Sequence, residues 1–450
     1  MSHPADHGQG QAQPALKRSV GTFQLFLFIL GDVLGAGVYV LAGQVAGRSG
    51  GAVWVPLLVA LVLALLTAGS YAELATRYPR AGGSSYYAHR AFGSWAGFLV
   101  GFCMLAAGIV SVGALALGFA GDYLAAFVQL PVPLTVTVFL VLLALLNARG
   151  IAESLAANSV ATIIEVSGLL LVVVLGAWVV LRGDADPSRL TQLGTPENGP
   201  VMAVLAGAVL AYYSYVGFET SVNLAEEARD PRRSFPRALF GALAVAGVIY
   251  GLVGAAASAV VPTDQLVAST GPLLEVVRVA GGVPLVLFSA IALVAVANGA
   301  LLTGIMSSRL AYGMARDGLL PSVLGKVLPG RRTPWVAIIV TTALSLLLAL
   351  LGSIEVLAST LVVLLLVVFS SVNLAVLVLR RRGTDPEAQA DHYRVPTLLP
   401  VLGLLSCLLL ATQVDGATWR FALPMLAVGA ALAVVAQRRT RRRSGAVAGR

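Results

Sequence analysis

Charged residues are scarce in this chain, because Asp, Glu, Lys and Arg make up only 11% of its 450 residues. Soluble globular domains carry about 25% charged residues. Hydrophobic residues reach 58%, and the mean hydropathy is +0.88. This composition excludes a water-soluble globular protein and predicts an integral membrane protein.

Cysteine and histidine are also rare, with 2 and 4 residues. Cys103 and Cys407 lie inside apolar stretches, where cysteine behaves as a small hydrophobic residue. Their spacing fits neither a disulfide framework nor a metal site. The histidines lie in the N-terminal tail or in loops, and the sequence has no nucleophile elbow and no phosphate-binding Gly-Lys-Ser. We therefore expect no enzyme, no metal and no cofactor.

Long apolar runs fill the chain instead. A helix crosses about 30 Å of hydrocarbon with about 20 mostly apolar residues. About twelve stretches fit, near 23–46, 52–76, 93–121, 133–148, 156–181, 200–224, 237–260, 283–308, 334–352, 356–379, 396–412 and 419–437. The sequence predicts an all-α integral membrane protein without a soluble domain. The polar tail of residues 1–19 lacks a cleavage site, so we expect no signal peptide.

The position of the basic residues explains the formal net charge of +9 without a nucleic-acid partner. If the N-terminus is cytoplasmic and the stretches alternate, 25 of the 30 Lys and Arg residues lie on the cytoplasmic side. The outer loops hold Arg48, Arg182, Arg189, Arg278 and Arg420. This bias predicts a multi-pass protein of the cell (plasma or inner) membrane with both termini cytoplasmic. The basic tail, 438–450, would anchor this topology or contact anionic lipid.

The first ten stretches form two sets of five, and the first stretch of each set is interrupted. The interruptions are Gly31–Gly37 and Ser214–Glu219. An odd number of spans per set inverts the second set relative to the first, so the pattern predicts an inverted repeat with a binding site at the membrane midplane. The predicted transport core covers 20–380, with repeats at about 20–182 and 200–380, followed by a cytoplasmic loop at 381–395 and two C-terminal spans at 396–437.

The breaks also predict the chemistry of the ligand. Backbone can unwind inside a membrane only where protein, water or a ligand replaces its lost hydrogen bonds. Free N–H groups at a helix start suit a carboxylate, and freed carbonyls suit an ammonium, so an α-amino acid fits both. The alternative is close helix packing, because Gly31 and Gly35, like Gly43 and Gly47, have the small-residue spacing of packed membrane helices.

Four segments carry a family resemblance. They are Gly35-Ala36-Gly37-Val38-Tyr39, Tyr71–Ser84, Gly217-Phe218-Glu219 with Glu226–Pro231 and Pro236, and Arg309–Pro321. In these places the chain resembles the amino acid–polyamine–organocation superfamily of permeases, over about residues 20–380. The resemblance implies an inverted repeat of five plus five helices with two additional C-terminal helices, working by alternating access.

The resemblance also implies the binding residues. For the substrate carboxylate these are the backbone of Gly35, Ala36 and Gly37, and for the amino group they are carbonyls near Val33 and at Tyr213, Ser214 and Val216.

Other residues near the breaks and at helix ends have two possible roles. Tyr212, Tyr213 and Tyr215 are candidates for a lid over the substrate or for plain packing, and Glu219 is a further gating candidate. Asn298 fits either the pocket or an interhelical hydrogen bond. At the inner helix ends we expect ion pairs and caps rather than substrate contacts from Glu73, Arg77, Arg80 and the pair Arg316 and Asp317.

The fifth stretch resembles the family through Gly150–Ser154 and Asn158, but it has Glu165 where many members have a lysine. The resemblance places this stretch beside the first break, so Glu165 is expected near the carbonyls of residues 33–35 and near Asp32. Two close carboxylates can share one proton. They could instead hold sodium, or Glu165 could serve only to link helices. Asp32 and Glu165 are the candidate ion-coupling residues.

The expected function is secondary active transport of an amino acid, coupled to protons or working by exchange. The alternatives are a carrier of polyamines, organocations or other small solutes, and an amino-acid receptor that does not transport. A channel fits less well, because the chain has two unlike halves around one site. We expect a neutral rather than a strongly cationic substrate, because the outer half of the expected pocket offers few acids and Asp32, Glu165 and Glu219 are expected to serve other roles.

Overall fold

The computed structural model describes residues 21–80, 82–150, 155–196, 198–382 and 388–448, without the side chains of 155–159 and 438–448. The regular structure of these residues is helical. The first half contains α1 (Thr22–Val33), α2 (Gly37–Ser49), α3 (Trp54–Arg77), α4 (Gly83–Phe92), α5 (Ser94–Phe119), α6 (Asp122–Ala125), α7 (Val132–Ala148) and α8 (Leu155–Leu181). The second half contains η1 (Pro187–Thr191), α9 (Pro200–Tyr213), η2 (Ser221–Glu226), α10 (Pro231–Val260), α11 (Thr263–Ala268), α12 (Pro272–Ala280), α13 (Leu285–Arg316), η3 (Ser322–Gly325), α14 (Trp335–Leu351), α15 (Ile354–Arg381), α16 (Leu398–Ala411) and α17 (Gly416–Ala448).

The apolar helices confirm the prediction of a multi-span membrane protein. Within the described ranges, seven helices are long and apolar enough to cross a bilayer, and the bent pair of α1 and α2 counts as an eighth. Four shorter apolar helices, α7, α9, α14 and α16, lie at the other predicted stretches. The number of twelve spans and the inverted repeat stay predictions.

The exposed surface of these helices is apolar, as a lipid environment requires. On α7 the exposed side chains include Leu134, Val138, Leu142 and Leu145, which lie on one face because helical neighbours recur every three to four residues. A contiguous apolar face of this kind would be unstable in water. The outward side of α7 therefore faces hydrocarbon.

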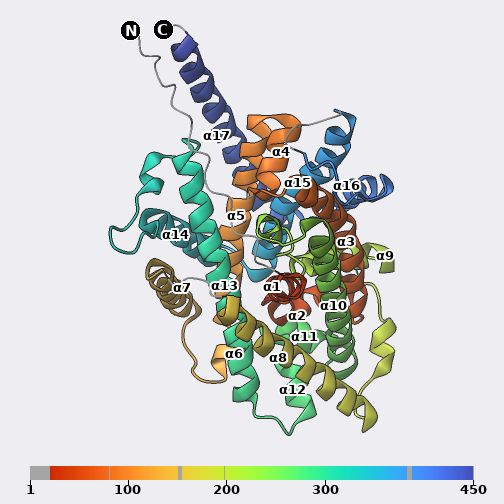
Figure 1. Ribbon diagram of the computed structural model, residues 1–450. Coiled ribbons are helices and arrows are strands. Elements are labelled where there is room, and N and C mark those ends of the chain that lie inside the picture. Colours follow the sequence, from red (N-terminus) through yellow and green to blue (C-terminus); the bar gives the residue numbers. More distant parts are fainter. Residues whose placement is uncertain (1–20, 81, 151–154, 197, 383–387, 449–450) are drawn as a thin grey trace, which may run out of the picture.

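The broken first span lies at the centre of the molecule (Figure 1). α1 packs on α8 and α10, whereas α2 packs on α9 and α11. α5 and α15, which contact each other over much of their lengths, run alongside this centre (Figure 1). The break between α1 and α2 is therefore held from several sides by long helices.

Several elements differ from the sequence-based expectation. The short helices α4, α11 and α12 were not predicted, because they are too short to give an apolar run of spanning length. The sixth stretch, expected over 200–224, ends as an α-helix at Tyr213. α17 continues to Ala448, past the expected end of the last span at 437, through a run of arginines that favour helix. The predicted tail of residues 1–19 lies outside the described residues.

Candidate substrate site at two helix breaks

The first break is an interruption of three residues between α1 and α2, where the helix axis bends by 45°. The last amide bonded to α1 is that of Leu34, which donates to the Leu30 carbonyl at 2.7 Å. Among the described residues, none accepts a hydrogen bond from the amides of Gly35, Ala36 or Gly37. These N–H groups lie at the positive end of the 13-residue helix α2, which favours an anion.

The second break follows α9, where consecutive turns replace the helix. The amides of Ser214, Tyr215 and Val216 each bond a carbonyl three residues back, at 3.0 to 3.1 Å. Gly217 has a φ of +131°, a conformation that residues with a side chain rarely adopt. Its amide donates to the Glu219 carboxylate at 2.8 Å, so this predicted gating residue holds its own turn together.

The two breaks touch each other through glycine. A Cβ atom on Gly37 would lie 2.8 Å from the Cα of Ser214 and 3.2 Å from the Tyr213 ring. A Cβ on Gly217 would lie 2.6 Å from the Asp32 carbonyl oxygen. Contacts this short leave no room for a side chain at either position. The predicted carboxylate-binding and ammonium-binding segments are thus brought into one place.

The glycines of the first span divide between two roles. A Cβ on Gly31 would lie 2.0 Å from the Thr162 hydroxyl of α8, and one on Gly43 would lie 2.1 Å from the Leu266 carbonyl of α11. For these two residues the alternative of close helix packing is confirmed. A Cβ on Gly35 would meet only the Asp32 carbonyl, at 3.5 Å. Gly35 therefore belongs to the break rather than to a packing interface, whereas Gly37 lies at the close contact between the two breaks.

Tyr250 of α10 joins the two breaks, and the sequence analysis missed it. Its hydroxyl donates to the Val33 carbonyl at 2.7 Å and lies at hydrogen-bonding distance, 3.1 Å, from the Ser214 carbonyl. Two carbonyls predicted to meet the amino group thus have a protein donor. Buried carbonyls in a membrane require such a partner. A tyrosine in an otherwise apolar span is the sequence signal that could have identified it.

One polar side chain at the junction has no partner. The Ser214 hydroxyl is buried, has no hydrogen-bond partner among the described residues, and would lie 3.2 Å from a Cβ on Gly37. It adds a donor beside the three amides of the first break. Gly299 of α13 closes the opposite side, because its Cβ position lies 3.8 Å from the Ala36 amide nitrogen.

The side chains of the three tyrosines at the end of α9 and in the break that follows it extend in different directions. The Tyr213 ring lies against Gly37, and its hydroxyl bonds Ser111 of α5 at 2.9 Å. Tyr215 donates to the Leu57 carbonyl of α3 at 3.0 Å, and the Tyr212 ring packs on Phe369 of α15. Of the three, Tyr213 is therefore the tyrosine whose ring lies against the first break. The predicted gating residues Tyr212 and Tyr215 contact the surrounding helices.

The two candidate ion-coupling residues occupy different surroundings. Asp32 accepts a hydrogen bond from the Thr220 hydroxyl, which ties α1 to the turn after the second break. Glu165 is fully buried on α8, and one carboxylate oxygen accepts from Asn298 of α13 at 3.2 Å. Its second oxygen has no partner among the described residues.

The hydrogen bonds of Glu165 connect three helices, α8, α2 and α13. Its backbone carbonyl accepts from the Tyr39 hydroxyl of α2 at 2.7 Å, and its carboxylate accepts from Asn298 of α13. Asn298, for which pocket and interhelical roles were both open, forms the interhelical bond. Of the family-like residues in the same stretch, 151–154 lie outside the described residues, as does the side chain of Asn158.

The C-terminal ends of α3 and α15 carry a second polar cluster. Glu73 of α3 accepts from the Arg380 guanidinium of α15, with the Nε donating at 2.7 Å, and from the Val395 amide at 3.0 Å. The backbone amide of Gln389 donates to the Arg77 backbone carbonyl at 2.8 Å. We call Glu73, Arg380 and residues 389–395 the α3–α15 clamp. The expected structural ion pair at Glu73 is confirmed.

No group of three or more His, Cys, Asp and Glu side chains that could hold a metal ion occurs in the described part of the chain. A sequence model of the amino acid permease family matches residues 20–434. This chain belongs to the amino acid permease family. The membership confirms the resemblance found in the sequence and makes the protein a multi-pass secondary transporter of amino acids.

Characterised relatives give the permease a wider context. The branched-chain amino acid permease BcaP of Bacillus subtilis is 27% identical over 90% of each chain. The methylthioribose transporter of the same organism is 26% identical over 92% of each chain. The cationic amino acid transporter 9, chloroplastic, of Arabidopsis thaliana is 33% identical over 70% of this chain and 58% of its own. These relatives are named as transporters, and their named substrates differ in charge and in chemical class.

Proposed function

We propose that this permease moves a neutral amino acid across the cell membrane by alternating access, with both termini cytoplasmic and the substrate held between the two helix breaks. The observation that carries the proposal is the set of free amides at Gly35–Gly37 beside the unpartnered Ser214 hydroxyl. A carboxylate would satisfy these donors and gain from the helix dipole. The ammonium would compete with Tyr250 for the carbonyls of the breaks.

The charge of the substrate follows from the engagement of the nearby acids. Asp32 accepts from Thr220, Glu219 from the Gly217 amide, and Glu165 from Asn298. A cationic side chain would have to displace one of these bonds. Arginine and lysine should therefore compete poorly with alanine, serine or leucine, and competition in the opposite order would contradict a neutral substrate.

Counterflow of labelled amino acids in proteoliposomes tests the transport function. Saturable exchange, driven by unlabelled substrate inside the vesicle, is the expected result. Unsaturable flux would indicate a channel, and binding without flux would indicate a receptor. A panel of the twenty amino acids, polyamines and methylthioribose would identify the substrate. If the protein selectively exchanged a polyamine or methylthioribose, that compound rather than an amino acid would be its substrate.

We further propose that Glu165 couples transport to protons, because a buried ionisable residue in a membrane is usually functional and one of its oxygens lacks a partner. Glu165→Gln keeps the oxygen that accepts from Asn298, so the fold should persist. Uptake driven by an inward proton gradient should be lost, while exchange without a gradient continues. If uptake by Glu165→Gln still depended on the proton gradient as in the parent protein, proton coupling through Glu165 would be contradicted. Stimulation of the parent by sodium alone would favour a sodium site.

A further inference from the structure

The loop between α13 and α14 contains an open hollow, separate from the helix breaks. Its volume is about 570 Å³, and its lining residues are Tyr312, Val327, Leu328, Pro329, Gly330 and Arg332. Arg316, one turn after Tyr312, donates to the Tyr312 hydroxyl at 3.0 Å and lies 5.9 Å from the centre of its ring. The hollow thus has a fixed aromatic wall.

The loop around the hollow is held in one conformation by hydrogen bonds. The Leu328 amide donates to the Thr333 carbonyl at 2.9 Å, and the Arg332 amide donates back to the Leu328 carbonyl at 3.0 Å. The Thr333 hydroxyl donates to the Ala148 carbonyl at 3.0 Å, which fixes the loop to the end of α7. Arg332 has a φ of +54° and is the one non-glycine residue with a positive φ in the described ranges. Such a conformation is costly for arginine, and strain of this kind collects at functional sites.

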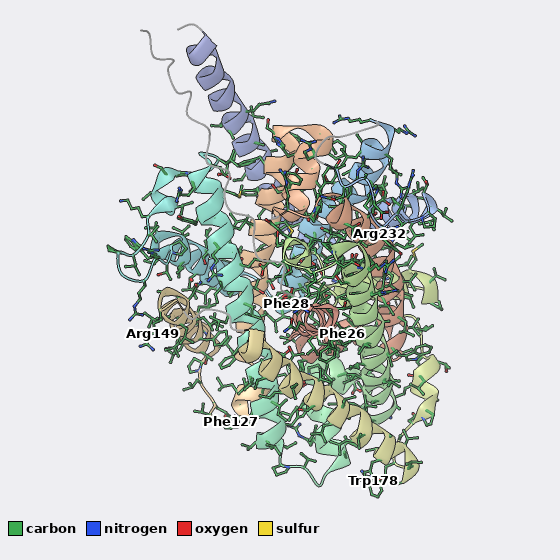
Figure 2. The ribbon with its side chains drawn as sticks, in the orientation of Figure 1. Phe26, Phe28, Phe127, Arg149, Trp178 and Arg232 are labelled. Carbon is green, nitrogen blue, oxygen red and sulfur yellow. The ribbon has the colours of Figure 1, made fainter. Side chains whose placement is uncertain are left out.

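Positive charge gathers around the hollow without acidic partners. Lys326, Arg331 and Arg332 are exposed and form no ion pair with any described residue. Asp317 is the one acid between α13 and α14. The end of α7 lies beside this loop, because a Cβ on Gly150, the residue after Arg149, would lie 3.7 Å from the Arg331 carbonyl. Figure 2 shows Arg149 at the edge of the molecule, where α7 ends.

Apolar side chains adjoin these cations. Val323, Val327 and Trp335 are exposed on the loop and at the start of α14. α7 and α14 contact each other next to this loop and expose further leucine, valine and isoleucine residues (Figure 1). Tryptophan and arginine mark the level of the membrane–water interface. Cations above an apolar seam match a phospholipid, whose anionic headgroup lies above its acyl chains.

We propose that this loop and the end of α7 form a binding site for an anionic phospholipid, with the phosphate at Arg331 and Arg332 and the acyl chains along the α7–α14 seam. Arginine binds phosphate through two parallel N–H bonds, and hydrogen bonds hold the backbone of the loop that carries both arginines. The site lies in the cytoplasmic leaflet, which rests on the topology of the proposed function. The binding itself requires no transport activity.

Thermal melting of the full chain in detergent, with added phosphatidylglycerol or phosphatidylcholine, tests the site. Phosphatidylglycerol should raise the melting temperature of the parent and phosphatidylcholine should not. Arg331→Gln with Arg332→Gln should weaken the apparent affinity for phosphatidylglycerol about tenfold, since each cation near an anionic surface contributes substantially. The matched control is Arg233→Gln with Arg237→Gln, two exposed cations at the start of α10 that should leave the affinity unchanged.

Equal losses in the two double variants would overturn the proposal, because they would indicate general attraction between a basic face and anionic lipid. Stabilisation of the parent by inorganic phosphate or glycerol 3-phosphate to the same extent would also overturn it in favour of a soluble anion. Arg332→Gly is a second variant that should keep the fold, since glycine adopts a positive φ without strain while the guanidinium is lost. It should melt as the parent does without lipid and lose about threefold in affinity for phosphatidylglycerol, and unchanged affinity would count against the site.

Discussion

The helix breaks and the α3–α15 clamp both bury polar groups inside an apolar molecule, but they satisfy them differently. In the clamp, both oxygens of Glu73 have donors, and Arg380 also donates to the Val395 carbonyl at 2.6 Å. At the breaks, the amides of Gly35–Gly37 and the Ser214 hydroxyl have no partner among the described residues. The clamp is complete without a ligand, whereas the breaks are not.

This difference separates stability from binding. A buried ion pair with all its hydrogen bonds contributes to the folded state only while both partners are present. Buried donors without a hydrogen bond instead destabilise the folded protein, and a bound ligand that accepts from them removes this unfavourable free energy. Changes in the clamp should therefore act on the free energy of unfolding, and changes at the breaks should act mainly on substrate affinity.

Arg380→Ala should produce the largest loss of stability, because it leaves the Glu73 carboxylate, 1% exposed, without its cation. The expected decrease in the free energy of unfolding is about 3–5 kcal/mol. Melting of the purified protein in detergent measures it. Arg381→Ala, at an exposed position on the same helix, is the control and should change little.

A double variant refines this first test. Glu73→Gln with Arg380→Gln removes both charges, so it should be less destabilised than Arg380→Ala alone. If Arg380→Ala and Arg381→Ala melt alike, the clamp does not stabilise the fold and the contrast with the breaks fails.

Gly37→Val should have the largest effect on binding. The new Cβ would lie 2.8 Å from the Ser214 Cα, so the two breaks must move apart. Displacement of binding groups by about 1 Å commonly costs a hundredfold, and we expect at least about that loss in substrate affinity. The measurement is substrate-induced thermal stabilisation of correctly folded protein.

Gly47→Ala is the matched control for the same helix, because its Cβ would meet Val267 at an ordinary contact distance of 3.5 Å. It should keep the stabilisation by substrate. Stabilisation that survives intact in Gly37→Val would place the substrate elsewhere in the molecule.

The sequence predicted features that local chemistry determines. Both breaks lie where glycine and polar residues interrupt apolar runs, because Gly37 and Gly217 fill positions that exclude a side chain. The partners of buried groups were not predictable in this way. Glu73 and Arg380 lie 307 residues apart, and Tyr250 meets Val33 across 217 residues. Their pairing depends on how helices pack, and one sequence alone does not contain that information.

Tyr250→Phe should have an effect of intermediate size, and it tests how the breaks differ from the clamp. It removes the donor to the Val33 carbonyl, so the protein without substrate should lose about 1–3 kcal/mol of stability. The substrate ammonium can replace this donor, so the rise in melting temperature on adding substrate should be larger than in the parent. Tyr215→Phe, which loses only its bond to the Leu57 carbonyl of α3, should be destabilised with an unchanged rise. Equal rises in the two variants would contradict a role of the Val33 carbonyl in binding.

The smallest effect is expected at a third polar cluster, which has the chemistry of the clamp but not its burial. Arg48 of α2 donates to Glu355 of α15 at 2.5 Å and to Asp415 before α17, and all three side chains are about one-third exposed. Burial alone would raise the pKa of Asp415, but hydrogen bonds from Thr418 and Arg48 outweigh it and lower the pKa below its usual value. A carboxyl with a lowered pKa stabilises the folded state above its unfolded pKa, near 3.9. That contribution is lost as the pH falls through the lower pKa of the folded state.

Because exposed pairs contribute little, Asp415→Asn should cost less than about 1 kcal/mol at pH 7. The difference in melting temperature between parent and Asp415→Asn should be constant from pH 7 to 5 and shrink below pH 4, and it should also narrow in 1 M salt. A difference that does not shrink at all as the pH falls below 4 would show that the Asp415 charge is not responsible. A difference as large as that of Arg380→Ala would show that burial does not separate the two clusters.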